Sequence, residues 1–132
     1  MVFDTNKERG NAGLSMAIAY FGANGYIVSL PLNDTQDYDL VVEKNKKLYK
    51  VQVKSTGYKG SKNSYQLALR SMGGTKGTVY KRVKDTDVDL IFALDAEKNM
   101  FLFPKSEIMN VNSSISISTD PKNRFSKYVV KI

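Results

Sequence analysis

The stretch that decides the fold reads YDLVVEKNKKLYKVQVKS over residues 38–55. Two alternating apolar segments flank a polar link, which predicts two antiparallel strands joined by a hairpin turn. An even-length link of this kind places Asp39 directly across from Gln52, and the same register places Asp37 across from Lys54. Directly opposed residues of an antiparallel pair point to the same side of the sheet. The side chains of Asp39, Gln52 and Lys54 are therefore predicted to converge.

The residues around this hairpin complete a single domain over 1–132 with an α/β fold. Thr5 and Glu8 form a capping-box pattern, which predicts that a first helix runs over 6–23. Residues 70–84 are predicted to form a basic, glycine-punctuated loop with one helical turn around 79–83, and a short helix is expected to start at Pro104. The predicted strands cover 26–30, 38–43, 48–56, 64–69, 88–94, 100–103, 115–117 and 128–130. Such an order favours a central mixed sheet flanked by helices, with the N-terminal helix first.

The composition excludes several kinds of chemistry. None of the 132 residues is cysteine or histidine, which excludes disulfides, thiolate metal sites and histidine-based catalysis. The net charge is +7, and twelve of the 20 Lys and Arg residues lie within 44–84, where no acidic residue occurs. This block predicts a polyanionic partner such as nucleic acid, although a solubilising lysine surface is the alternative. The candidate phosphate contacts are Lys59, Lys62, Arg70, Lys76, Lys81 and Arg82.

The predicted convergence of a carboxylate, an amide oxygen and an ammonium group suits a hard divalent cation. Mg²⁺ prefers oxygen ligands and keeps several waters, and Mn²⁺ can substitute for it. A bound cation lowers the pKa of a coordinated water, and Lys54 can position that water or stabilise developing negative charge. The alternatives are structural: Asp39 is an exposed strand end or pairs with Lys50 or Lys54, and Gln52 and Lys54 belong to a solvent-facing stripe.

These motifs together carry a resemblance to a known family. Asp39, then Gln52-Val53-Lys54, preceded by a helix bearing Glu8, resembles the PD-(D/E)xK nuclease superfamily. The pattern is most similar to members with glutamine in the last motif, such as group I intron-associated homing endonucleases, and archaeal Holliday-junction resolvases are a related comparison. The resemblance implies a restriction-endonuclease-like core in which Asp39 binds the metal and Lys54 is the catalytic lysine. It also implies that Gln52 stands where a second acid is usual, that Glu8 is the helix-borne acid, and that the Val53 carbonyl is a ligand.

The sequence therefore predicts a cytoplasmic, Mg²⁺-dependent DNA endonuclease that hydrolyses phosphodiester bonds with a metal-activated water. By analogy, an enzyme that cuts two strands is expected to be a homodimer or a higher homo-oligomer. Because Gln52 lacks a negative charge, the metal affinity is expected to be weaker than in a Glu-x-Lys site. The alternatives are a non-catalytic DNA- or RNA-binding module with the same fold, and a basic protein that binds an acidic protein. Glu8 also has a purely structural explanation as the capping-box partner of Thr5.

Overall fold

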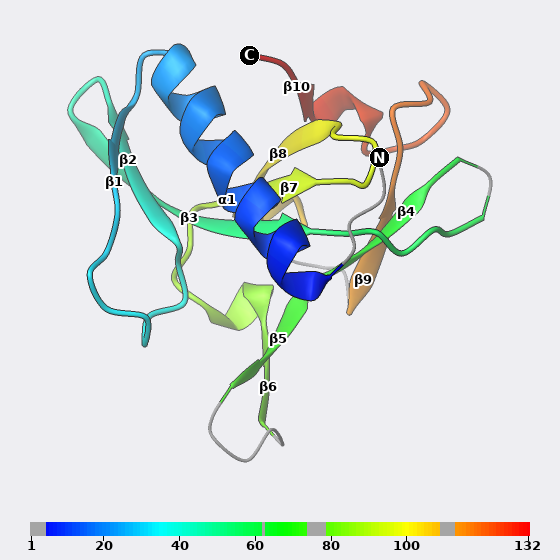
Figure 1. Ribbon diagram of the computed structural model, residues 1–132, viewed down its shortest axis with the longest axis horizontal. Coiled ribbons are helices and arrows are strands. Elements are labelled where there is room, and N and C mark those ends of the chain that lie inside the picture. Colours follow the sequence, from blue (N-terminus) through cyan, green and yellow to red (C-terminus); the bar gives the residue numbers. More distant parts are fainter. Residues whose placement is uncertain (1–4, 62, 74–78, 109–112) are drawn as a thin grey trace.

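A helix laid across a six-stranded sheet forms the centre of the computed structural model (Figure 1), which describes residues 5–61, 63–73, 79–108 and 113–132. The helix is α1 (Asn6–Ala23). The strands, in their order across the sheet, are β1 (Ile27–Ser29), β2 (Leu40–Lys44), β3 (Lys47–Ser55), β7 (Leu90–Leu94), β8 (Met100–Pro104) and β10 (Val129–Val130). Neighbouring strands are antiparallel except for β3 and β7, which run parallel. The sheet is therefore mixed, as predicted.

Two further pairs of strands lie outside this sheet. β4 (Tyr65–Ala68) pairs with β9 (Ser114–Ile117), and β5 (Arg70–Gly73) pairs with β6 (Val79–Arg82), both antiparallel. Three single 3-10 turns complete the described elements: η1 (Val83–Asp85), η2 (Lys105–Glu107) and η3 (Ser126–Tyr128). The long connection between the parallel neighbours β3 and β7 thus carries β4, β5, β6 and η1.

Each face of the central sheet has its own hydrophobic core. On one face, Phe21 of α1 packs with Leu40, Val42 and Phe92 of the sheet, and all four are fully buried. On the other face, buried residues of β7 and β8 pack against β4 and β9 through a second cluster that includes Leu67 and Ile117. The second face is thus covered by a small sheet, where the sequence analysis expected a helix.

The hairpin register is confirmed over the paired residues. β2 and β3 pair from Leu40 opposite Val51 to Lys44 opposite Lys47, the register that the sequence predicted. The ladder ends at Leu40, so the predicted pairing of Asp37 with Lys54 does not form. Asp39 lies one position beyond the last paired residue.

The loop expected over 70–84 is wrong for the described residues 70–73 and 79–84, and 74–78 lie outside the described residues. The described residues supply β5 and β6, and the helical conformation is confined to the 3-10 turn η1 that follows. The reason is the anchoring of the two ends: Leu69 and Val83 are both buried, and the Val83 amide donates to the Leu69 carbonyl at 2.8 Å. Holding the ends side by side favours strand pairing between them. The helix expected from Pro104 is likewise only the turn η2. Within the described ranges, no helix has the length and apolar character needed to cross a membrane.

Candidate active site

Asp39 is fixed to β3 by two hydrogen bonds. Its backbone amide donates to the Val51 carbonyl at 2.8 Å, and its Oδ2 accepts from the Val53 amide at 2.7 Å. If β2 began earlier, one of its backbone carbonyls would accept from the Val53 amide. The Asp39 carboxylate accepts that hydrogen bond instead, so the strand predicted over 38–43 begins two residues later, at Leu40. The side chain cannot swing away without leaving a strand amide unpaired.

The side chains of Gln52 and Lys54 project from β3 on the face of the sheet opposite α1. In the parallel pairing, Gln52 lies opposite Ile91 and Lys54 opposite Ala93, and both partners belong to the core on that face. The Gln52 Oε1 atom is buried and has no hydrogen-bond partner among the described residues. An unpaired buried acceptor costs roughly 1–3 kcal/mol, so this oxygen is positioned to accept a cation or a donor.

Burial and mutual attraction act in opposite directions on the charges of Asp39 and Lys54. Asp39 is exposed, yet the protein packed around its carboxylate withdraws enough water to raise its pKa above 3.8, against the lowering effects of the Val53 amide and the Lys54 charge. Burial lowers the pKa of Lys54 below 10.5, although the Asp39 charge opposes the shift. Burial therefore disfavours the charged form of each group, while the opposite charge of the other group favours it. A bound cation or phosphate would change this balance.

Lys50 does not pair with Asp39, which removes one structural alternative for that carboxylate. The Lys50 ammonium forms an ion pair with Asp87 at 2.5 Å, and the Lys50 amide donates to Asp89 Oδ2 at 2.8 Å. The hydrogen bond to Asp87 is the main reason that the pKa of Lys50 is raised. These contacts join β3 to the segment before β7 and hold the strand that carries Gln52.

Helix α1 brings its first turns to the end of β3 (Figure 1). Thr5 caps the helix by accepting from the Glu8 amide at 3.1 Å, so the predicted cap is confirmed. A Cβ added to Gly13 would lie 3.3 Å from Val53 Cγ1, and one added to Gly57 would lie 3.0 Å from the Arg9 guanidinium. Glu8 thus stands in the turn that lies beside the end of β3, and its role in the site stays a prediction.

A pocket of about 350 Å³ opens beside Asp39. Leu14 of α1 forms one wall, and the loop before β2 forms the other. That loop contributes Asn33, Asp34 and Gln36, polar side chains that the sequence analysis did not single out. The sequence does show a run of mostly polar residues between Pro31 and Tyr38. Such a run is equally typical of an ordinary surface loop, so it did not predict a pocket.

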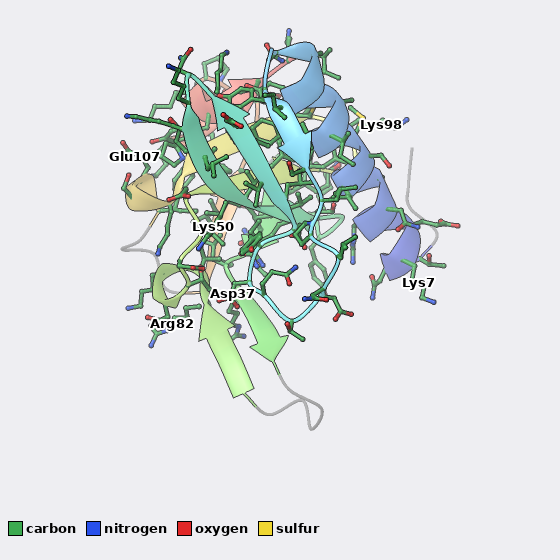
Figure 2. All side chains as sticks on the ribbon, turned by 90° about the vertical axis from the view of Figure 1, so that its left-hand side faces the viewer. Lys7, Asp37, Lys50, Arg82, Lys98 and Glu107 are labelled. Carbon is green, nitrogen blue, oxygen red and sulfur yellow. The ribbon has the colours of Figure 1, made fainter. Side chains whose placement is uncertain are left out.

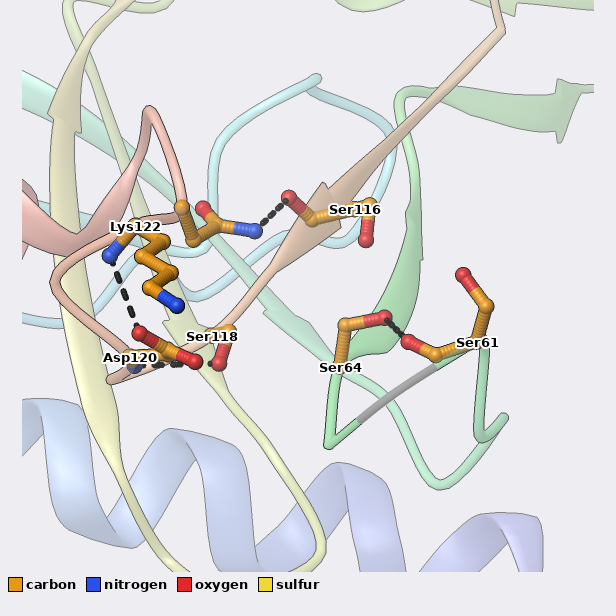
Figure 3. Close-up of a pocket in the computed structure, with 7 residues that line it drawn as sticks. Ser61, Ser64, Ser116, Ser118, Asp120 and Lys122 are labelled. Atoms are coloured by element: carbon orange, nitrogen blue, oxygen red, sulfur yellow. Dashed lines mark hydrogen bonds between the residues drawn. The ribbon is translucent and has the colours of Figure 1, made fainter.

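A second pocket, shown in Figure 3, shares no residue with this site. Its volume is about 250 Å³, and its lining includes Ser64, Ser118, Asp120 and Asn123. The polar atoms bond to one another and to nearby backbone: Ser118 Oγ accepts from the Asp120 amide at 3.0 Å, and Asn123 Nδ2 donates to a backbone carbonyl of β9 at 3.1 Å. The pocket is a polar turn held together by its own hydrogen bonds.

The predicted phosphate contacts have mixed outcomes. Lys59, Arg70 and Arg82 are exposed, the last two at the base of the β5–β6 pair. Lys81 lies in β6, where the backbone is described but the side chain is not, and Lys62 and Lys76 lie outside the described residues.

A sequence profile of the PD-(D/E)XK endonucleases matches residues 4–131, nearly the whole chain. The chain belongs to this family. The PD-(D/E)XK endonuclease is also similar to a solved structure, that of the bacterial homing endonuclease I-Ssp6803I, with a TM-score of 0.78 and 26% sequence identity. The match covers 95% of this chain and 88% of that one. Among curated proteins, no sequence matches this endonuclease. The predicted family and the restriction-endonuclease-like fold are therefore confirmed.

The oxygen donors of the endonuclease at this hairpin fit a hard divalent cation. Asp39 supplies a fixed carboxylate and Gln52 a buried amide oxygen without a partner, and both are oxygen donors of the kind that Mg²⁺ binds. Among the described residues, no group of three or more His, Cys, Asp or Glu is placed to hold a metal.

Proposed function

We propose that this PD-(D/E)XK endonuclease hydrolyses phosphodiester bonds of DNA with the help of a divalent metal ion, Mg²⁺ or Mn²⁺. The observation that carries the proposal is the β2–β3 hairpin, where a carboxylate fixed to the strand lies near a half-buried lysine and an unpartnered amide oxygen. Metal-assisted hydrolysis of a phosphodiester uses oxygen ligands for the metal and a cation near the developing negative charge. This hairpin supplies both.

Each side chain has a separate role in the proposal. Asp39 and Gln52 would hold the metal through their side-chain oxygens, and the Val53 carbonyl and Glu8 would complete the set predicted from the family. When bound, the metal would supply an activated water and neutralise charge on the phosphoryl oxygens. Lys54 lies near Asp39, and its ammonium group would orient the attacking water or stabilise the negative charge that develops at the phosphate.

Two features favour DNA as the substrate. Twelve of the 20 basic residues lie within 44–84, a stretch without any acid that begins beside the site, and the similar solved structure is that of a bacterial homing endonuclease. This similarity favours duplex DNA over a branched junction. Because two symmetry-related copies of the site can cut the two strands of a duplex, we propose by analogy that the enzyme acts as a homodimer or a higher homo-oligomer.

The test is cleavage of supercoiled plasmid and of a synthetic four-way junction in Mg²⁺, Mn²⁺ or EDTA. We expect metal-dependent cutting that is lost in Asp39→Asn and Lys54→Met. The matched controls Asp120→Asn and Lys98→Met remove the same charges away from the hairpin and should cut normally. Light scattering of the same samples reports the oligomeric state.

A narrowly sequence-specific enzyme can be silent on arbitrary DNA, so a second measurement keeps the proposal falsifiable. Calorimetric titration with Mn²⁺ should show a site in the wild type that disappears in Asp39→Asn and persists in Asp120→Asn. If the wild type neither cuts nor binds metal through Asp39, the proposal fails. Tight, salt-sensitive DNA binding in that case would favour the non-catalytic binding module.

A further inference from the structure

A third pocket lies at the end of β3, between the first turns of α1 and the β4–β9 pair. Its volume is about 250 Å³. The described residues that line it include Arg9 of α1, Ser55 and Thr56 at the end of β3, Gln66 and Ala68 of β4, and Ser114 of β9. None of these residues is acidic. We call this cavity the Arg9 pocket.

Arg9 brings a positive charge into the pocket. Its side chain is partly buried, it donates a hydrogen bond to the Asn6 side chain, and it forms no ion pair within the described part of the chain. A guanidinium has five N–H donors, so protein groups of that part leave most of its donors unused. A cation that is partly withdrawn from water is stabilised by a paired anion, and phosphate oxygens accept the parallel N–H donors of arginine in pairs. The pocket is therefore suited to a phosphate group.

Hydrogen bonds fix the wall opposite Arg9 before any ligand binds. Thr56 Oγ1 donates to the Gln66 carbonyl at 2.5 Å and accepts from the Tyr58 amide at 3.1 Å, and the Gln66 amide donates to the Tyr58 carbonyl at 2.8 Å. The Ser114 hydroxyl makes only a long contact of 3.5 Å with Gln66 Oε1, so it remains a donor for a ligand. A wall that is ordered in advance lowers the entropic cost of binding.

The Arg9 pocket is also at the correct distance from the candidate active site. Ser55 lies two residues beyond Val53, whose amide holds the Asp39 carboxylate, and two strand residues span about 7 Å. β2 pairs with β3 only as far as Val51, which leaves that edge of β3 open over the same distance. Two steps along one strand of a DNA duplex also advance about 7 Å. A strand with its scissile phosphate at Asp39 therefore brings another phosphate to the pocket.

Both places lie at the same end of the molecule. Figure 2 shows Lys7, in the first turn of α1, and Asp37, two residues before Asp39, in the lower half of the view. Lys98 lies toward the top of the same view. DNA that is bound at the candidate active site can therefore also reach the first turns of α1.

We propose that the Arg9 pocket binds a backbone phosphate of the DNA substrate, two nucleotides from the scissile phosphate, with the Arg9 guanidinium as the main contact. The proposal rests on the proposed function, because it takes DNA as the substrate. It assigns Arg9 to substrate positioning and leaves the cleavage chemistry to the hairpin.

The first experiment measures binding to duplex DNA without metal over a range of salt concentrations. Arg9→Gln is compared with Lys7→Gln, which removes one charge from an exposed position two residues away on the same helix. Loss of one phosphate contact should reduce the slope of log K against log salt by about 1 and weaken binding about fivefold at 0.15 M salt. Lys7→Gln should keep the wild-type slope, and so should Arg9→Lys, which retains the charge. An unchanged slope in Arg9→Gln, or an equal loss in Lys7→Gln, would overturn the proposal.

The second experiment fills the pocket without changing any charge. Ala68 is exposed and lies directly opposite Ser114 in the strand register, so the two side chains point the same way and Ala68→Leu occupies the space between the walls. Ala19→Leu makes the same change at an exposed position of α1. We expect Ala68→Leu to weaken DNA binding about fivefold, as the loss of one phosphate contact does, and Ala19→Leu to bind normally. Normal binding by Ala68→Leu would overturn the proposal, because it would mean that no phosphate enters the pocket.

The third experiment uses the wild-type protein, so it does not depend on any variant folding, and it separates a DNA phosphate from a free one. The NMR signal of the Arg9 Nε–Hε group is followed during titration with duplex DNA and, at matched ionic strength and phosphate concentration, with inorganic phosphate. We expect the duplex to shift this signal and inorganic phosphate to shift it much less. A larger shift with inorganic phosphate would assign the pocket to a free phosphate and overturn its role in DNA binding, and no shift with either would overturn the pocket as a phosphate site.

Failure of this proposal and failure of the nuclease proposal give different results. Cutting that depends on Asp39, together with DNA binding that is indifferent to Arg9 and Ala68, overturns only the phosphate pocket. DNA binding that depends on Arg9 and Ala68, without any cutting or metal site, overturns only the nuclease and leaves the pocket in place.

Discussion

The contact between α1 and β3 at Gly13 allows a quantitative test of how the site is held. A Cβ added to Gly13 would overlap Ser55 Oγ and would lie 3.3 Å from Val53 Cγ1. Replacing Gly by Ala in a helix interior gains about 1 kcal/mol of intrinsic stability, whereas overpacking of this kind costs about 1–3 kcal/mol. The overlap is expected to win, so Gly13→Ala should lower the free energy of unfolding by about 1 kcal/mol.

A double-mutant cycle with Ser55→Ala isolates the cause. The Ser55 hydroxyl is buried without a hydrogen-bond partner in the described part of the chain, so its removal alone should change stability by less than about 1 kcal/mol. Without that hydroxyl, the new Cβ of Gly13→Ala meets Ser55 Cβ at an ordinary 3.6 Å, and the helix-propensity gain remains. The coupling energy should therefore be about 2 kcal/mol. Urea denaturation of the four metal-free proteins, followed by circular dichroism, measures it.

Two outcomes would refute this reasoning. One is a Gly13→Ala protein that is as stable as the wild type or more so, which would mean that α1 is not seated against β3 as closely as the structure has it. The other is additivity of the two changes within about 0.5 kcal/mol, which would mean that the hydroxyl is not the obstacle. Gly22, whose Cβ would meet nothing within 4 Å, is the matched control: Gly22→Ala should stabilise the protein.

Three further predictions concern charge. In the metal-free protein, the Lys54 pKa should lie below 10.5 because burial disfavours the ammonium form, and Asp39→Asn should lower this pKa further by removing the opposing charge. Nitrogen-detected NMR titration measures the Lys54 pKa in both proteins. A wild-type pKa at or above 10.5 would contradict this explanation. Since the unfolded chain then binds more protons between the lowered pKa and 10.5, the contribution of Lys54 to the free energy of unfolding should rise with pH across that window. Gln52→Glu should tighten Mn²⁺ binding roughly tenfold by adding a negative charge at the metal, with Gln66→Glu unchanged in the same calorimetric titration; equal effects would mean that Gln52 does not face the metal. Asp95 is 1% exposed and accepts hydrogen bonds from two amides of its own turn, each at 2.9 Å, so Asp95→Ala should lower the free energy of unfolding by about 2–3 kcal/mol, and a loss under 1 kcal/mol in urea denaturation would refute this role.

Local patterns made much of the fold predictable. The helix 6–23 coincides with α1 because its cap lies in a four-residue motif and its stop in Asn24-Gly25. The hairpin register follows from the length of a short polar link, which is also local information. The conformation of 70–84 was not predictable in the same way. It depends on Leu69 and Val83 being held side by side by the distant core, and no pattern within the segment records that constraint.

The residues of the candidate site also differ in whether the local sequence could predict them. Asp39, Gln52 and Lys54 could be picked out because they lie on one hairpin whose register the sequence specifies. The Val53 amide that holds the Asp39 carboxylate could not, because the prediction extended β2 by two residues and so gave that amide a backbone partner. The pocket walls from Leu14 and the loop before β2 likewise required the packing of α1 on the sheet.

The placement of β3 has a consequence for the order in which the molecule folds. β3 pairs antiparallel with β2 through a tight turn and parallel with β7 across a long stretch of chain. A hairpin forms in about 1–10 μs, whereas non-local parallel pairing is intrinsically slower. Pulse-labelled hydrogen exchange would report the two steps at two amides: the Val53 amide donates to Asp39 within the hairpin, and the Thr56 amide donates to the Leu94 carbonyl of β7. We expect the side chains of Asp39, Gln52 and Lys54 to come together in the hairpin while most of the chain is still solvated. The later pairing of β7 with β3 should then exclude water from between them.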